Sequence, residues 1–403
     1  MEKSDDKSGI LIQGIKIGID ARFIQRPMRG MPMYTYMLCQ LLPKALPNVH
    51  FYLFINSAFK HNDKQDNYQS RLEEIKRHLN VTIVDIPSSG EFIWEQWKLP
   101  KLLKKYQINL LHMPGNRVCF FLGTKQISTI HDAMEWKKLN IFKGFNLAKA
   151  FREKFYTIRI RAYLWLLYRL GLKRANHILT ISQYAQDSIL ASFPFLSQKI
   201  SYTYHGIPPL YADNFREEAF LSKRKGVLML GGDSFQKNPV NMIQAWNLLS
   251  GDLKNKHPLT VAGFTGNHNS PISLKLAELN NPKNIHIKGW ISDFELVELF
   301  QQHRVFIFAS REEGFGFPLL QSMRIGTPVV TSKAEVLAEI GSDAVFSADA
   351  ENPQKLSEKL AQVLEDDELW QDCRKRGIER AKEFNWDKTA QDIATLYINV
   401  ISS

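Results

Sequence analysis

The sequence has few cysteines and no long apolar run. Its three cysteines, Cys39, Cys119 and Cys373, are far apart, with no CxxC pair and no histidine cluster nearby. This pattern gives no support to a disulfide framework or a Cys/His zinc site and suits a reducing compartment. The longest apolar stretch, Ala162 to Leu172, contains Arg169 and is shorter than the roughly 20 residues that span a bilayer. The charged N-terminus lacks the apolar core of a secretory signal. We expect a cytoplasmic protein, soluble or peripheral at a membrane.

Two acidic patterns are also missing. The chain has no D-x-D triplet, so we expect no obligatory divalent metal and no cofactor. It also has no pair of carboxylates placed as in a glycosidase.

Short β-rich runs alternate with longer segments of helical period, which is typical of parallel sheets built from βαβ units. We expect thirteen strands, seven in the first half and six in the second. They are 15–19, 51–55, 81–86, 109–112, 126–130, 178–181 and 200–204, then 227–230, 259–263, 285–289, 305–309, 329–332 and 344–346.

At 403 residues, the chain is long enough for two α/β domains. We expect an N-terminal Rossmann-like domain over 1–208, a polar linker over 209–225 and a second Rossmann-like domain over 226–385. An amphipathic helix over 386–403 is expected to cross back to the first domain. Ligands of doubly wound domains bind beyond the carboxyl ends of the strands, so we expect the two domains to face a cleft.

The segment after the expected strand 305–309 has the residues of a ligand-binding turn. Gly314 and Gly316 would let the backbone approach a ligand, and Pro318 lies in the first turn of an expected helix. Free N–H groups there could bind a phosphate, and Glu313 could accept hydrogen bonds from sugar hydroxyls. On chemistry alone, a plain strand–turn–helix junction stays open as an alternative.

Glu313 to Val330 resembles the E-G-F-G…P…G-x-P-V-V signature of the retaining GT-B glycosyltransferases of family 4. Further blocks similar to that family cover nearly the whole chain. They are Gly18–Arg22 with Gly30 and Tyr34, Trp94–Pro100, Leu111–Pro114 with Asn116, Thr129–Asp132, Leu179–Ser182, Tyr204–Ile207, Gly231–Asp233 with Gln236–Asn238, and Gly289–Asp293.

The resemblance implies a transfer of a hexose from a nucleotide-diphospho-sugar, and three catalytic residues. Lys237 would bind the donor diphosphate, His131 would lie beside the transferred sugar, and Glu313 would hold its hydroxyls. The leaving phosphate itself would deprotonate the acceptor. The implied donor-binding residues are Gly30, Ser182, Gly231, Gly232, Asn238, Gly314, Phe315, Gly316, Phe317, Pro318, Leu319 and Gln321.

Three positions around the donor depart from the family pattern. Gln321 stands where a second glutamate usually grips the ribose, which removes a charge-assisted hydrogen bond. Pro32 replaces the second glycine of the loop after Gly30 and has no N–H to donate. Gly231 lies where an arginine often assists the lysine. A non-catalytic, glycosyltransferase-like module that binds sugar nucleotides is therefore an alternative.

The net charge of +11 comes almost entirely from one segment. Residues 137–175 contain eleven Lys and Arg against the single acid Glu153, interleaved with eight aromatic residues. This composition is typical of a helix at an anionic membrane surface. The residues expected to face the membrane are Lys137, Lys138, Lys143, Lys149, Arg152, Lys154, Arg159 and Arg161.

Two alternatives for this segment stay open. One is a helical pair with packed aromatics and solvated charges, and the other is a nucleic-acid surface, for which no motif is present. The family resemblance and the basic segment together imply a glycan or glycolipid acceptor, such as a lipid-linked sugar of bacterial polysaccharide or lipopolysaccharide synthesis. The donor base and sugar stay open among GDP-mannose, UDP-sugars and dTDP-sugars.

Overall fold

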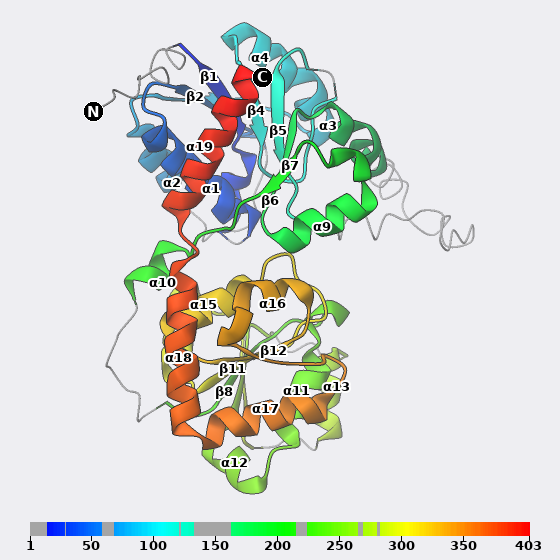
Figure 1. The fold of residues 1–403 in the computed structure, drawn as a ribbon, viewed down its shortest axis with the longest axis vertical. Coiled ribbons are helices and arrows are strands. Elements are labelled where there is room, and N and C mark those ends of the chain that lie inside the picture. Colours follow the sequence, from blue (N-terminus) through cyan, green and yellow to red (C-terminus); the bar gives the residue numbers. More distant parts are fainter. Residues whose placement is uncertain are drawn as a thin grey trace, which may run out of the picture. The chain divides into compact units, whose positions relative to one another are not determined.

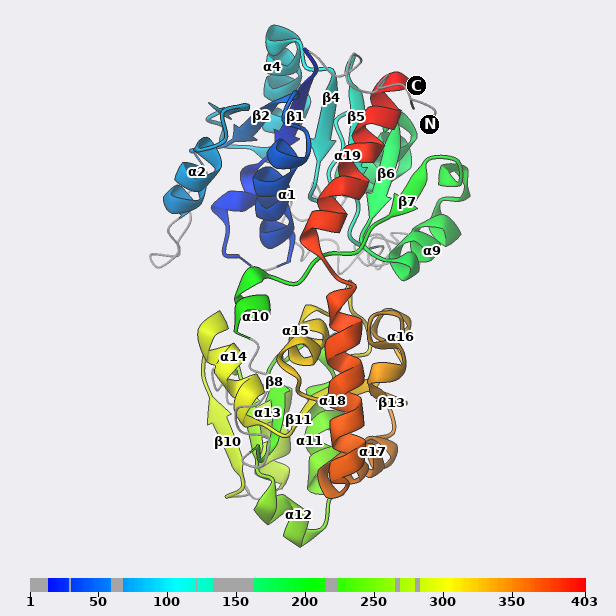
Figure 2. The same cartoon turned by 60° about the vertical axis from the view of Figure 1, so that its left-hand side comes forward.

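The computed structural model describes residues 14–28, 30–58, 68–120, 122–132, 163–214, 224–264, 269–279 and 283–403. The chain divides into two compact units. The first comprises Met1–His205 and Trp386–Ser403, and the second comprises Gly206–Asn385. Each unit is built around one parallel sheet, as Figures 1 and 2 show. The structure therefore has the two Rossmann-like α/β domains that the sequence predicts.

The sheet of the first unit has seven strands in the order β3-β2-β1-β4-β5-β6-β7, all paired in parallel. Parallel pairing needs a crossover between successive strands, and both faces of the sheet are covered as a result. The strands are β1 (Lys16–Asp20), β2 (His50–Ile55), β3 (Val81–Asp85), β4 (Leu110–Met113), β5 (Lys125–Thr129), β6 (His177–Thr180) and β7 (Ile200–Tyr202).

Side chains that alternate along these strands form separate cores on the two faces of the sheet. Ile17 and Ile19 pack with α1 (Met31–Ala45) and α19 (Trp386–Ser402) on one face, while Phe54 and Leu111 pack with α4 (Leu99–Tyr106) on the other. The helices of this unit are α1 (Met31–Ala45), α2 (Tyr68–Lys76), α3 (Glu91–Ile93), α4 (Leu99–Tyr106), α8 (Leu172–Arg174), α9 (Gln183–Ser192) and α19 (Trp386–Ser402).

The second unit has a six-stranded parallel sheet in the order β10-β9-β8-β11-β12-β13. Its strands are β8 (Val227–Leu230), β9 (Leu259–Ala262), β10 (Ile285–Lys288), β11 (Val305–Phe308), β12 (Val329–Ser332) and β13 (Phe346–Ala348). Its helices are α10 (Pro209–Asp213), α11 (Pro239–Asn247), α12 (Gly251–Lys256), α13 (Pro271–Glu278), α14 (Asp293–Gln302), α15 (Phe317–Ile325), α16 (Glu335–Gly341), α17 (Pro353–Glu365) and α18 (Asp367–Lys382).

The thirteen strands of the described residues agree with the expected ones within two residues at each end. The largest shift is at β13, where the apolar run 344–346 marks the approach to the strand. The stretch expected as a linker, 209–225, begins with α10, which buries Tyr211 in the second unit. Residues 215–223 lie outside the described part of the chain.

Helix α19 completes the core of the first unit, far along the chain from the strands it covers. It lies beside α1 in both views (Figures 1 and 2). Tyr397 is buried and bonded through its hydroxyl to Nδ1 of His112 at 2.5 Å. The Lys125 ammonium donates to the carbonyls of Val400 and Ile401, both at 3.0 Å, at the C-terminal end of the helix. The amphipathic face is thus anchored at several points.

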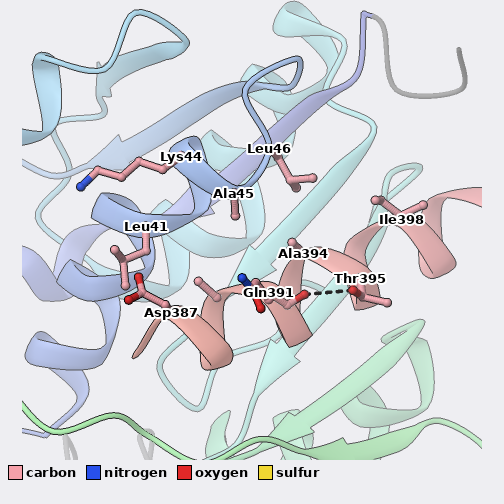
Figure 3. Close-up of a pocket in the computed structure, with 10 residues that line it drawn as sticks. Leu41, Lys44, Ala45, Leu46, Asp387, Gln391, Ala394, Thr395 and Ile398 are labelled. Carbon is pink, nitrogen blue, oxygen red and sulfur yellow. Dashed lines mark hydrogen bonds between the residues drawn. The ribbon is translucent and has the colours of Figure 1, made fainter. Parts of the chain in front are cut away.

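A pocket of about 470 Å³ lies between α1 and α19 on the first unit (Figure 3). Leu41 and Ala45 contribute its apolar wall from α1, and Ala394 and Ile398 contribute to it from α19. No residue that the sequence assigns to donor binding or catalysis lines this pocket.

Candidate active site

The centre of the candidate site in the second unit is an ion pair between two predicted catalytic residues. Nζ of Lys237 donates to Oε1 of Glu313 at 2.7 Å. Lys237 follows β8 and Glu313 follows β11, and these strands are neighbours in the sheet. The carboxyl ends of parallel strands meet at one edge, which is why residues 76 positions apart come into contact. The Lys237 side chain is 42% exposed, so the ammonium can still reach a ligand.

The loop that carries Lys237 is fixed to the loop that carries Glu313 by Arg311. The Arg311 backbone N–H donates to the carbonyl of Gln236 at 2.8 Å, and its guanidinium stacks over the Phe235 ring at 4.0 Å. The same guanidinium forms an ion pair with Glu351. These contacts hold the two loops in one arrangement.

Asn238, predicted to bind donor, has a structural role in this loop. It is buried, adopts a left-handed backbone with φ +55°, and lies directly before α11. Its Nδ2 donates to the carbonyls of Ala309 and Ala350 at 2.9 and 2.8 Å. The side chain therefore links the start of α11 to the end of β11.

Gly231 and Gly232 lie where the backbone leaves β8. A Cβ atom on Gly231 would lie 2.9 Å from Cβ of Phe264 and 3.1 Å from its backbone nitrogen. The Gly231 N–H also donates to the carbonyl of Ala262 at 2.6 Å. The close approach of Ala262, at the end of β9, and of Phe264 beyond it explains why this chain has glycine, and not a long cation, at this position. At Gly232 the crowding comes from the stem of Lys237, 3.1 Å away.

The turn into α15 has the conformation that the sequence predicts. Gly316 is left-handed with φ +92°, and Phe317 and Pro318 open the helix. Gly314 precedes this turn and is partly exposed. Because the first turn of a helix has no intrahelical acceptors for its N–H groups, the N-terminus of α15 is a position of the kind at which anions bind.

Side chains of this turn are divided between core and surface. Phe315 and Leu319 are buried, and Phe315 contacts Phe317 and Phe384 at ring distances of 5.0 and 6.1 Å. These side chains support the turn, and only backbone atoms of Phe315 and Leu319 remain for a donor. Gln321 is partly exposed on the second turn of α15, so its amide is accessible.

His131, the third predicted catalytic residue, lies in the first unit directly after β5. Its backbone N–H donates to Oδ1 of Asn116 at 2.7 Å, and Nε2 lies 2.8 Å from the carbonyl of Pro114. Since a carbonyl only accepts, Nε2 carries the proton and Nδ1 is left as an acceptor. Burial lowers the pKa of His131 to about 4, so the imidazole is neutral at pH 7.

A buried cluster of rings surrounds His131 that the sequence motifs did not indicate. The His205 ring stacks on His131 at 5.5 Å, and the Tyr34 ring meets both edge-on. The Tyr34 hydroxyl bonds to Oγ1 of Thr129 at 3.0 Å, and Nε2 of His112 bonds to the same oxygen at 2.8 Å. The motifs contain His112 and His205, but nothing in the sequence shows that they join one cluster.

Two further predicted donor residues lie in the first unit. Gly30 precedes α1, is exposed, and has φ +59°. Pro32 is in the first turn of this helix, where a missing N–H breaks no intrahelical bond. Ser182 is buried before α9, and its Oγ accepts from the N–H of Ala185 at 3.1 Å. The Ser182 hydroxyl thus caps a helix, and its part in donor binding stays a prediction.

The eight residues expected to face a membrane all lie outside the described residues. In the described part of the first unit, three large apolar side chains are exposed on one helical segment: Phe92 (46%), Ile93 (51%) and Trp97 (62%). The exposed Lys101, Lys104 and Lys105 follow on α4.

No helix of the described chain is both long and apolar enough to cross a bilayer. Within the same residues, no group of three or more His, Cys, Asp or Glu could hold a metal ion.

Comparison with known proteins gives two family matches. Residues 28–209 match Glycosyltransferase Family 4, and residues 212–380 match Glycosyl transferases group 1. The O-antigen chain mannosyltransferase B of Escherichia coli is 28% identical over 235 residues, which cover 56% of this chain. The match spans 61% of that relative, less than two thirds of its length.

Solved structures share the fold at low identity. WaaG, a glycosyltransferase involved in lipopolysaccharide biosynthesis, has a TM-score of 0.67 at 14% identity, covering 94% of this chain and 99% of WaaG. Anabaena HepE in complex with UDP-glucose has a TM-score of 0.64 at 13% identity, covering 95% and 99%. The two family matches lie end to end along a chain with this GT-B fold, and the chain therefore belongs to the group 1, family 4 glycosyltransferases.

Proposed function

We propose that this chain is a retaining glycosyltransferase that moves a hexose from a nucleotide-diphospho-sugar to a glycan or glycolipid acceptor. The Lys237–Glu313 pair is the observation that carries the proposal. It puts a partly exposed cation and a carboxylate 2.7 Å apart at the carboxyl edge of a parallel sheet, beside the N-terminus of α15. A diphosphate is bound by a cation and by backbone N–H donors, and the hydroxyls of a sugar are bound by a carboxylate that accepts their hydrogen bonds. Lys237, the N-terminus of α15 and Glu313 supply these three groups at one edge of the sheet.

The proposed reaction uses these groups as follows. The bond between the sugar C1 and the diphosphate oxygen breaks, and the acceptor oxygen bonds to C1 from the same face. The departing diphosphate takes the acceptor proton, and Lys237 with the α15 backbone stabilises the charge that develops. His131 is neutral, since its pKa is about 4, and contributes a hydrogen bond through Nδ1 and not a positive charge. Because Lys237 supplies the positive charge, we propose that transfer needs no divalent metal.

Two similar proteins indicate which donors to test first. Mannose is the first sugar to test because the similar E. coli protein is named a mannosyltransferase, and UDP is one base to test because HepE is seen with UDP-glucose. Because Gln321 stands in place of a carboxylate, we expect a weaker hydrogen bond to the ribose of the donor.

We propose that the acceptor is held at the cytoplasmic face of a membrane, as in polysaccharide or lipopolysaccharide assembly. The basic segment 137–175 supports this, as do the exposed Phe92, Ile93 and Trp97 beside the lysines of α4. Aromatic side chains next to lysines are typical of proteins that bind the interface of anionic bilayers.

The test is a panel of GDP-, UDP- and dTDP-sugars with purified protein, with and without EDTA. We expect slow hydrolysis of one sugar nucleotide, release of its nucleoside diphosphate, and no effect of EDTA. A thermal-shift screen identifies the base independently, because a selective ligand stabilises the fold by mass action. Binding without turnover for every donor and acceptor would favour the non-catalytic module, and binding of nothing would count against both.

A further inference from the structure

The Trp94–Pro100 block has no part in the proposed chemistry, yet its conformation is unusual. Residues Trp94–Lys98 form a π-helical turn, η2, between α3 and α4. Three successive side chains, Trp94, Glu95 and Gln96, are buried there, at no more than 5% exposure. A regular surface helix turns every third or fourth side chain inward, and the wider π-turn allows three in a row. Such turns often occur at functional sites.

Gln96 and Glu95 both bond to the loop that follows β4. Nε2 of Gln96 donates to the carbonyl of Val118 at 3.0 Å, and its Oε1 accepts from the N–H of Phe120 at 2.7 Å. The Glu95 carbonyl accepts from Sγ of Cys119 at 3.0 Å. The two residues of η2 therefore bond to three consecutive residues of this loop.

The same loop holds His131. The Glu95 carboxylate lies 3.5 Å from Nε of Arg117, and Nη1 of Arg117 donates to the carbonyl of Asn116 at 3.1 Å. Asn116 has a left-handed backbone, with φ +55°, and accepts the backbone N–H of His131 at 2.7 Å. Pro114 accepts the ring N–H of His131 at 2.8 Å. Every hydrogen bond described above for His131 thus comes from the segment that η2 holds.

Glu95 is itself held rigidly. It is fully buried, and its Oε1 accepts from Nη2 of Arg22 at 2.7 Å. Arg22 also binds Asp20 through two hydrogen bonds of 2.9 and 2.7 Å and stacks over the Trp94 ring at 3.8 Å. A buried carboxylate with such charge-assisted bonds has little freedom to move.

We propose that Glu95 and Gln96 are positioning residues for His131: they fix the 114–120 loop, which sets the place and the tautomer of the imidazole. The inference rests on the proposed function, because it matters for turnover only if His131 acts on the transferred sugar. It assigns a role to the Trp94–Pro100 block that neither the family matches nor the site geometry supplies.

The test compares Gln96→Met, Glu95→Gln and a matched control, Asn80→Ala. Asn80 also holds a loop of the first unit through its side chain, donating from Nδ2 to the carbonyls of Pro43, Leu46 and Val49. Asn80 precedes β3 and so lies at the amino-terminal ends of the strands, whereas the 114–120 loop and His131 follow the carboxyl ends of β4 and β5. Each variant is measured for kcat and donor KM on the sugar nucleotide found above, and for backbone hydrogen exchange over 114–131. Gln96→Met removes no charge and carries the test if Glu95→Gln fails to fold.

We expect both η2 variants to exchange faster over 114–131 and to lose about 10- to 100-fold in kcat, because small displacements of a reacting group are costly. Donor KM should change less than about twofold, since the Lys237–Glu313 site is untouched. Asn80→Ala should lose stability but keep kcat. Faster exchange with an unchanged kcat would overturn the inference, as would equal losses of kcat in all three variants. A fully active His131→Ala would instead refute the role of His131 in the proposed function.

Discussion

The Lys237–Glu313 contact gives the most direct residue-level test of the proposed donor site. Replacing Lys237 by Met keeps the apolar stem and removes the ammonium, so the leaving diphosphate loses its cation. We expect kcat/KM for the sugar nucleotide to fall about 100-fold or more, which is typical for loss of a preorganised electrostatic group. Lys254→Met is the control, because Lys254 donates to the carbonyl of Asn247 on the same unit, outside the site. An equal, small effect of both substitutions would refute the assignment.

Gln321 allows a test in the opposite direction. Gln321→Glu introduces, at this partly exposed position of α15, the carboxylate that the family resemblance implies. A charge-assisted hydrogen bond to the ribose is stronger than a neutral one, so we expect about three- to tenfold tighter binding of the nucleoside diphosphate. Isothermal titration of the wild type, Gln321→Glu and Gln321→Ala measures this. If the glutamate variant binds no better than the alanine variant, Gln321 does not contact the ribose.

Residue roles could be predicted from the sequence only where a motif carries them. Lys237 and Glu313 were predicted as partners of one ligand, and the structure brings them together. Asn238 and Ser182 came from the same motifs, but their side chains bond to the protein itself. Neither contact leaves a local pattern, because their partners are set by how distant segments pack. The reason for Gly231 is likewise visible only when β9 is in place.

At the scale of elements, the turn into α15 depends on one glycine conformation. Gly316 has φ +92°, and a Cβ there would lie 2.7 Å from Cδ2 of Leu337. Gly316→Ala should therefore lower the free energy of unfolding by about 1–3 kcal/mol, as strained left-handed residues do. Gly251→Ala, at the start of α12 with nothing within 4 Å of the new Cβ, should be neutral or stabilising. Urea unfolding compares the two. Equal stabilities would contradict the strain argument.

The helical segment 91–106 offers a test of membrane binding within the described residues. Trp97 is 62% exposed and followed by the lysines of α4. Trp97→Ser should weaken co-sedimentation with vesicles of anionic phospholipid at low salt severalfold, because an interfacial tryptophan is lost. Trp290→Ser, which removes a tryptophan of 64% exposure from the second unit, is the control. If wild-type protein binds neutral and anionic vesicles equally weakly, the membrane proposal is wrong.

Helices and strands could be predicted better from the sequence than the turns and contacts that connect them. Buried parallel strands are short apolar runs, so all thirteen strands of the described chain could be located from the sequence. The π-turn at Trp94–Lys98 could not be located in this way. Its contacts are bonds from Glu95 and Gln96 to the loop after β4, and such bonds between distant segments leave no local sequence pattern. The amphipathic pattern of α19 predicted that it would dock, but the bond between Tyr397 and His112 joins positions 285 residues apart.

For the whole molecule, buried histidines predict how stability depends on pH. Burial lowers the pKa of His112 to about 3, lowers those of His131, His177 and His257 to about 4, and lowers that of His205 well below its usual value. These folded-state values lie below the unfolded value of about 6.5, so the unfolded chain binds more protons as pH falls through this window. The stability that these histidines contribute is therefore fully present above about pH 6.5 and is lost progressively as the pH falls towards 4.

Each such histidine lowers the free energy of unfolding by about 1.4 kcal/mol per pH unit, over the pH range in which it is protonated only in the unfolded state. When every described histidine with a lowered pKa is counted, six lie in the first unit (His50, His78, His112, His131, His177 and His205) and two, His257 and His303, lie in the second. Urea unfolding at pH 7.5, 6.0 and 5.0, followed by separate probes for each unit, should show a larger loss for the first unit. Equal pH dependence of the two transitions, or none, would contradict this reading.

The return of α19 to the first unit has a consequence for synthesis on the ribosome. The core around Ile17, Phe51 and Tyr397 includes residues from both ends of the described chain. The second unit, Gly206–Asn385, is continuous and can close as soon as it leaves the exit tunnel. The first unit emerges earlier, yet an apolar surface on α1 and its sheet stays uncovered until Trp386–Ser402 has been translated. The unit translated first is thus completed second, and its apolar surface is exposed to aggregation in the interval.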